Sequence, residues 1–147
     1  MFGFRICLLV ALVVATTSVT SAEDYVVPTG VTVLTEEQLL NQIIGNTLMG
    51  GYYRWFAYFL PPSGDQKKGR FRGKTASRTG QHSGDWTVNG SLMCWHFDKK
   101  NLGHLNDCFT TNLDGDTVTW YLPDGTPRYS KYGRISLISG NSENLDI

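Results

Sequence analysis

The stretch DWTVNGSLMCWHF, residues 85–97, decides how the rest of the chain folds. Both of its halves are rich in β-branched and aromatic side chains, as strands usually are. Between them stands Asn89-Gly90, the dipeptide that most strongly favours a two-residue turn between antiparallel strands. The stretch therefore predicts a β-hairpin that joins residues 85–88 to residues 92–97.

Similar short runs fill most of the chain on either side of this hairpin. The other expected strands are residues 52–60, 69–76, 107–111, 117–122, 128–132 and 134–138. They are separated by turn chemistry, such as the Pro-Pro-Ser-Gly-Asp stretch at 61–65 and two Asp-Gly pairs, and no helical period lies between them. We expect a mainly β fold, a small antiparallel meander or barrel of about eight strands, since closure removes exposed sheet edges.

One segment before the strands is predicted to be a helix. Thr35 and Gln38 have the spacing of a capping box, in which each side chain bonds the other residue's backbone N–H. An apolar stripe follows at positions 39, 40, 43 and 44, and Gly45 is a suitable stop. This N-terminal helix is expected to plug one end of a barrel or to lie along its wall.

The first 22 residues have the features of a signal peptide. Arg5 precedes the apolar run of residues 6–15, and small residues lead up to Ala22. The run is shorter than the roughly 20 residues of a membrane span, although an uncleaved anchor is the alternative. We expect a signal peptide at 1–22, an extended segment at 23–34, a helix and barrel domain at 35–139 and a polar tail at 140–147. The mature chain would be periplasmic or secreted, without a transmembrane segment.

Charge is balanced overall but uneven along the sequence. The chain has 13 basic and 13 acidic side chains, and loss of the leader removes one basic residue, Arg5. This balance argues against binding to nucleic acid. Six cations nevertheless follow one another without an intervening acid: Lys67, Lys68, Arg70, Arg72, Lys74 and Arg78. Such a local positive field can attract an anionic partner.

Two cysteines remain after the leader, Cys94 and Cys108. In an oxidising compartment an even count indicates a disulfide. A zinc site with His96 and His104 is the alternative, but the C-x-x-C and H-x3-H spacings typical of such sites are missing. A disulfide is therefore expected, with no metal and no other cofactor.

The motifs resemble those of a family of small exported bacterial proteins of unknown function. The resemblance lies in the stretch IGNTLMG at 44–50, the Gly84-Asp85-Trp86 motif, the Leu-Met-Cys stretch at 92–94 and a second cysteine at 108. Met93 departs from the family pattern, because it interrupts an expected Leu-Cys pair. The resemblance implies export, a disulfide and a β fold, and it implies no particular activity.

The sequence His82-Ser83-x-Asp85 contains the residue types of a hydrolytic triad. A working triad requires each side chain to point at the next, which neighbours in a tight loop seldom achieve. We interpret these residues as a turn before the strand that contains Trp86.

The candidate binding surface combines cations and aromatic rings. Strand alternation places Arg70, Arg72 and Lys74 on one face, opposite Phe71. The candidate ligand-binding residues are Arg70, Arg72, Lys74, Arg78, Trp55 and Tyr53, with an anionic polysaccharide, a lipid head group or an acidic protein as partner. In the alternative interpretation the rings fill the barrel and the cations keep its wall soluble.

The leading functional hypothesis is an exported, non-enzymatic binding or interaction module. A second hypothesis is an inhibitor that blocks a secreted enzyme through an exposed loop at 63–68 or 80–84. A third is a small hydrolase centred on His82 or His96. A hollow barrel would instead favour carriage of a small molecule.

Overall fold

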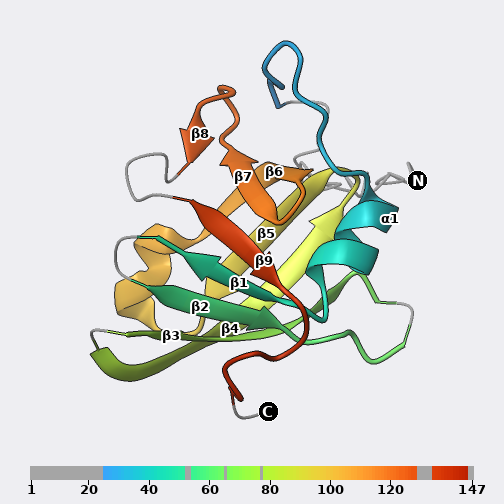
Figure 1. The fold of residues 1–147 in the computed structure, drawn as a ribbon. Helices are drawn as coiled ribbons and strands as arrows, with labels where there is room; N and C mark the ends of the chain where they lie inside the picture. The colour runs from blue at the N-terminus through green and yellow to red at the C-terminus, as the bar shows by residue number, and fades with distance from the viewer. Residues whose placement is uncertain (1–24, 52–53, 65, 77, 129–133, 146–147) are drawn as a thin grey trace, which may run out of the picture.

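The computed structural model describes residues 25–51, 54–64, 66–76, 78–128 and 134–145. Eight strands close into an antiparallel barrel, to which a ninth strand, β8, is added (Figure 1). The predicted signal peptide and Tyr53 lie outside the described residues. No helix in the described part of the chain is long and apolar enough to cross a lipid bilayer.

The strands follow one another around the barrel in chain order. They are β1 (Thr47–Gly50), β2 (Trp55–Phe59), β3 (Lys68–Thr75), β4 (Arg78–Asn89), β5 (Leu92–Phe97), β6 (Asp107–Asp114), β7 (Thr117–Tyr121), β8 (Pro127–Arg128) and β9 (Ile135–Ile138). β9 lies between β7 and β1 and thereby closes the barrel. β8 pairs with the second half of β7, next to the part that pairs with β9. The expected up-and-down antiparallel barrel is confirmed.

The hairpin of residues 85–97 forms as the sequence predicts. Asn89 pairs with Leu92, and Gly90 at the turn has a φ of 59°. β4, however, starts at Arg78, seven residues before the predicted start at residue 85. Residues 80–84 are therefore part of a strand, and the expected turn at His82 and the exposed loop of the inhibitor hypothesis are both wrong there.

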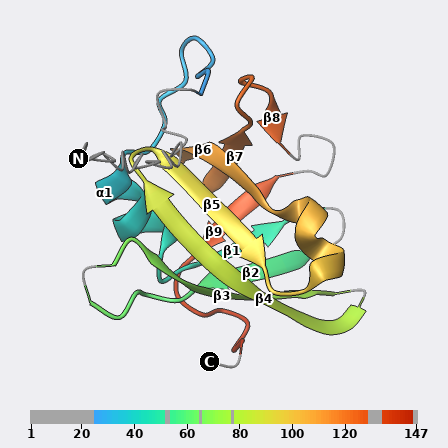
Figure 2. The ribbon, with the colours of Figure 1, turned by 180° about the vertical axis from the view of Figure 1, so that it is seen from behind.

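The predicted capping box is present at the start of the helical segment. Thr35 Oγ1 accepts from Gln38 N–H (3.3 Å), and Gln38 Oε1 accepts from Thr35 N–H (2.9 Å). α1 (Glu36–Gln38) continues into the π-helical turn η2 (Leu39–Ile43), whose fully buried Leu39 and Ile43 join the barrel core. A hydrogen bond from Gly90 N–H to Glu36 ties this segment to the end of the barrel that carries the β4–β5 turn (Figure 2).

Large aromatic side chains fill the barrel interior. The rings belong to Trp55, Phe59, Phe71, Trp86, Trp95, Phe97, Phe109 and Trp120. The centroids of neighbouring rings lie between 4.6 and 6.2 Å apart. This packing is that of a filled core, which favours the interpretation of the rings as core residues over a small-molecule carrier.

Glycines on neighbouring strands make room for these rings. Gly84 pairs with Phe71 across β3 and β4. A Cβ atom at Gly84 would lie 2.0 Å from the carbonyl oxygen of His96 and 2.5 Å from the Phe71 ring. Glycine is therefore required at this position by close packing.

Two segments outside the barrel lie on its outer wall. Val26 N–H donates to Pro123 O and Leu34 N–H to Thr111 O, which places the N-terminal segment beside β6 and the turn after β7. Residues 140–145 run past the outside of the wall formed by β2 and β3, below these strands in both views (Figures 1 and 2). The sequence suggested a polar tail here, and its described part is docked on the barrel.

Candidate functional site

The outer face of β3 carries four cations at alternating positions. Phe71 and Gly73 are buried toward the core, so Lys68, Arg70, Arg72 and Lys74 face outward, as strand alternation predicted. We call these four residues the cationic row. Neighbouring members of the row are about 6.6 Å apart along the strand, because each residue of a strand adds about 3.3 Å.

The neighbouring strand β4 places acceptors opposite this row. Asp85 pairs with Arg70, and Ser83 pairs with Arg72. Arg70 Nη1 donates to Asp85 Oδ1 (2.7 Å) and to Asp98 Oδ1 (2.9 Å), and its Nη2 donates to Asp98 Oδ2. Ser83 Oγ donates to Asp98 as well (2.6 Å). Arg70 is thus fixed between two carboxylates, and its charge is already compensated.

The same contacts change the pKa values of Asp98 and Arg70. The Arg70 guanidinium, and after it the Ser83 hydroxyl, lower the pKa of Asp98 from its ordinary 3.8 to about 2. The two carboxylates in turn raise the pKa of Arg70 above its ordinary value. Arg70 and Asp98 are therefore both ionised over the whole physiological pH range.

Lys74 and Arg72 differ in their surroundings. Lys74 Nζ lies 2.8 Å from Glu143 and 5.7 Å from the centre of the Phe56 ring. Within the described residues no carboxylate lies within 4 Å of Arg72, and its buried Nε has no hydrogen-bond partner. Lys68 is exposed and likewise has no carboxylate partner in the described part of the chain. Two of the four cations, Lys68 and Arg72, therefore have no ion-pair partner within 4 Å among the described residues, although the charge of Arg72 also contributes to the lowered pKa of Asp98.

The remaining candidate residues are not brought together with this row. Trp55 points into the barrel, where its ring stacks on Trp120 at 5.9 Å, so it lies on the opposite side of the wall from Arg70. Tyr53 lies outside the described residues, and of Arg78 the structure describes only the backbone, which begins β4. Among the described residues of β2, Phe56 and Tyr58 lie on the cationic face, as the cross-strand partners of Lys74 and Arg72.

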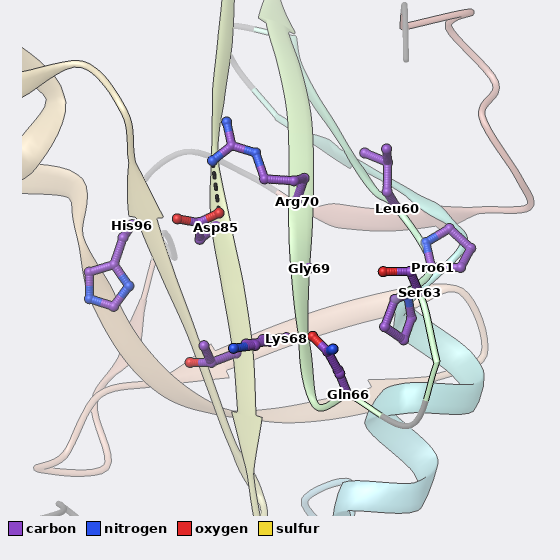
Figure 3. A pocket seen from close by; sticks show the side chains of 11 residues that line it. Leu60, Pro61, Ser63, Gln66, Lys68, Gly69, Arg70, Asp85 and His96 are labelled. Carbon is purple, nitrogen blue, oxygen red and sulfur yellow. Dashed lines mark hydrogen bonds and ion pairs between the residues drawn. The ribbon is translucent and has the colours of Figure 1, made fainter.

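An open groove of about 600 Å³ borders the cationic row (Figure 3). Lys68 and Arg70 lie in its middle, Asp85 and His96 on one side, and Leu60, Pro61, Ser63 and Gln66 on the other. The loop that forms this second side is fixed to the barrel, because Trp86 Nε1 donates to Leu60 O (3.1 Å) and Lys67 pairs with Glu36 of the helix (2.5 Å). The groove offers both hydrogen-bond donors and acceptors around one uncompensated ammonium group.

The triad residues suggested by the sequence do not assemble. β4 alternation turns His82 to the same side as Gly84 and Trp86, which face the core. Ser83 and Asp85 point outward instead. A triad that uses His82 is therefore excluded by the geometry of the strand, while His96 remains in the groove.

The cysteines form the expected disulfide. Cys94 and Cys108 are direct partners on β5 and β6, with their Cα atoms 4.0 Å apart. Their sulfurs are consequently not available as zinc ligands. The described residues also contain no group of three or more His, Cys, Asp or Glu side chains arranged to hold a metal ion.

The fold and site together define an up-and-down antiparallel β-barrel with a filled core and a cationic row on its outer wall. No family model, curated protein or solved structure matches this chain.

Several residues of the site were missed at the level of the sequence: Ser83, Asp85, Asp98 and Glu143. Ser83 and Asp85 could have been found if the predicted strand had been extended back to Arg78. The longer strand places Ser83 opposite Arg72 and Asp85 opposite Arg70. Asp98 follows the end of β5, and Glu143 comes from beyond β9, so no local pattern connects either residue to β3.

The depressed pKa of Asp98 leads to a direct test. A folded-state pKa of about 2, below the ordinary 3.8, means that this carboxylate stabilises the fold above pH 3.8 and loses its effect as the pH falls toward 2. In an NMR titration of the carboxyl carbons, Arg70→Gln is expected to move the pKa of Asp98 back toward 3.8. Lys99→Gln, which removes the charge next in sequence, should leave it nearly unchanged. An Asp98 that titrates normally in the wild type would contradict the network.

Proposed function

We propose that the protein is an exported, non-enzymatic binding module whose cationic row and adjoining groove hold a partner through its carboxylate groups. The observation that carries this proposal is the placement of Lys68 and Arg72. They flank Arg70 on the outer wall, and no carboxylate of the described chain lies within 4 Å of either. These two cations, rather than Arg70, are expected to meet the anionic groups of the partner.

Arg70 has a supporting part in this proposal. Its guanidinium is held by Asp85 and Asp98, so it adds fixed donors but little net charge. Two carboxylates next to the row would disfavour a cluster of dense anions such as phosphate groups, by like-charge repulsion. Single carboxylates spaced along a polymer fit better, because they can pair with Lys68 and Arg72 on either side. An acidic protein segment and an acidic polysaccharide both offer this chemistry.

The test measures binding to three probes: poly-glutamate, a polyuronate, and vesicles that contain an anionic phospholipid. A carboxylate polymer is expected to bind, with an affinity that falls steeply as salt is raised because exposed charges are screened. The double substitution Lys68→Gln/Arg72→Gln should weaken this binding by about tenfold, equivalent to about 1.4 kcal/mol. The polymer that binds best identifies the source of the carboxylates.

The matched control is Lys99→Gln/Lys100→Gln, which removes the same charge from two exposed lysines outside the row. It is expected to leave most of the affinity intact. Equal losses of affinity in the two double variants would show that binding depends on the overall charge and not on a particular site. Absence of binding to both carboxylate polymers, even if the phospholipid vesicles bind, would refute the proposal.

A further inference from the structure

The segment after β9 is attached to the barrel wall by two polar side chains. We call residues 140–145 the C-terminal strap. Gly140 N–H donates to Asn46 Oδ1 (2.9 Å), Thr47 Oγ1 donates to Gly140 O (2.5 Å), and Ser142 N–H donates to Thr47 Oγ1 (3.3 Å). Thr47 is fully buried, although β1 alternation turns its neighbour Leu48 and not Thr47 into the core. The wall at Thr47 is therefore covered by the strap.

The strap has a compact shape of its own. The Asn141 side chain closes a loop with Leu145, accepting its N–H at Oδ1 (2.9 Å) and donating from Nδ2 to its carbonyl (3.0 Å). Asn144 within this loop has a φ of 45°. The strap follows the end of β9 at Ile138 and belongs to none of the described strands. Side-chain contacts, not sheet pairing, hold it in place.

This loop presents two chemically different groups to the wall. Glu143 pairs with Lys74 of the cationic row (2.8 Å), and about a third or less of either side chain is exposed. Leu145 is only 2 % exposed, yet it does not belong to the cluster that fills the barrel interior. The strap thus brings a carboxylate to the outer wall and, two residues further on, a buried apolar side chain that is not part of the barrel core.

We infer that this part of the wall is a docking surface for an acidic peptide segment, and that the C-terminal strap is its intramolecular occupant. The inference rests on the proposed function, since it takes the cationic row as the recognition surface. It also narrows the partner to a protein. A polyuronate could supply the carboxylate, but it has no aliphatic side chain to take the buried place of Leu145.

The strap and an external peptide compete for the same contacts. A segment joined to the barrel by a short connection acts at an effective concentration in the millimolar range. A free peptide with the same contacts cannot displace it at ordinary concentrations. A partner must therefore bind more tightly than the strap, or bind after the strap has been released.

The experiment uses the full chain with the strap weakened by Glu143→Gln/Leu145→Ser. Circular dichroism checks that the barrel stays folded, and NMR amide exchange checks that the amides of Gly140 and Ser142 lose their protection. A peptide with the sequence of residues 139–145, SGNSENL, is then added, and the amide signals of Thr47 and Lys74 are followed. We expect it to bind this variant at least about tenfold more tightly than the wild type, in which the strap competes.

Two further arms test the chemistry of the contact. A peptide with glutamine in place of its glutamate should bind about threefold or more weakly, and Lys74→Gln in the variant should remove this difference. If the variant is folded and its strap is released but no signal moves, the docking surface is refuted. That result leaves the Lys68 and Arg72 test untouched, because the two experiments follow different residues.

If the double variant unfolds, the peptide cannot be tested on it. Glu143→Gln alone keeps the question open to measurement in that case. It is expected to speed amide exchange at Ser142 by about threefold, while the exchange of the β1 and β2 amides stays at the wild-type rate. Unchanged exchange at Ser142 would refute a displaceable strap.

Discussion

Trp95→Ala is expected to lower the free energy of unfolding by about 3–5 kcal/mol, the largest effect of any single substitution considered. Trp95 is 4 % exposed and lies at the centre of the barrel interior. Its ring contacts six others, those of Trp55, Phe59, Phe71, Phe97, Phe109 and Trp120. Alanine would leave a cavity that rings anchored on several different strands cannot all close. Urea denaturation, followed by circular dichroism, measures the loss.

Trp95→Phe is the matched control for this prediction. Phenylalanine keeps an aromatic ring in the cluster and removes an indole N–H that has no hydrogen-bond partner within the described residues. Relief of that unpaired donor offsets part of the lost packing, so the expected cost is only about 1–2 kcal/mol. Similar losses in the two variants would mean that the rings do not form one packed core. If the alanine variant does not fold, the phenylalanine variant still gives a measurable stability.

The hairpin of residues 85–97 was predictable because its information is local. Asn89-Gly90 favours one kind of turn whatever surrounds it, and this turn brings the apolar runs on its two sides together as neighbouring strands. β5 consequently has the predicted ends, Leu92 and Phe97. The capping box at Thr35 is local in the same way, and it too is found as predicted.

The missed strand segments have non-local causes. The first half of β4 contains Gly80 and Gly84 among polar residues, and by itself it favours a loop. Gly84 is there because the Phe71 ring of β3 leaves no space for a Cβ. β1 ends in Gly50, where a Cβ would lie 2.1 Å from the Trp55 ring of β2. Both segments become strands through their partners, which no local propensity reveals.

The candidate site was also predictable only in its local features. Alternation along β3 was sufficient to place Arg70, Arg72 and Lys74 outward. It was not sufficient to show which cations are compensated, since Asp98 and Glu143 arrive from other parts of the chain. The sequence therefore predicted a uniformly basic face. The structure has instead two cations paired with carboxylates and two, Lys68 and Arg72, without such a partner in the described residues.

Cys94→Ala/Cys108→Ala is expected to cost about 3 kcal/mol of stability, the estimate for a closed loop of about 15 residues. The sequence separation in this chain is 14, and the cross-link joins direct partners on β5 and β6. In the unfolded chain the bond restricts the segment that includes η3 (Lys100–Leu105), and this restriction is lost in the variant. Replacing both cysteines avoids a free thiol that could react with other molecules.

Reduction provides an independent measurement of the same quantity. A reducing agent should lower the denaturation midpoint of the wild type to that of the double variant, and it should leave the variant unchanged. Added zinc should not restore the midpoint of the reduced wild type, because the cysteines are placed for a bond to each other and no cluster of metal ligands surrounds them in the described residues. A double variant as stable as the wild type would show that β5 and β6 are held in register by the sheet and the aromatic core alone. Restoration by zinc would instead support the metal-site interpretation of Cys94 and Cys108.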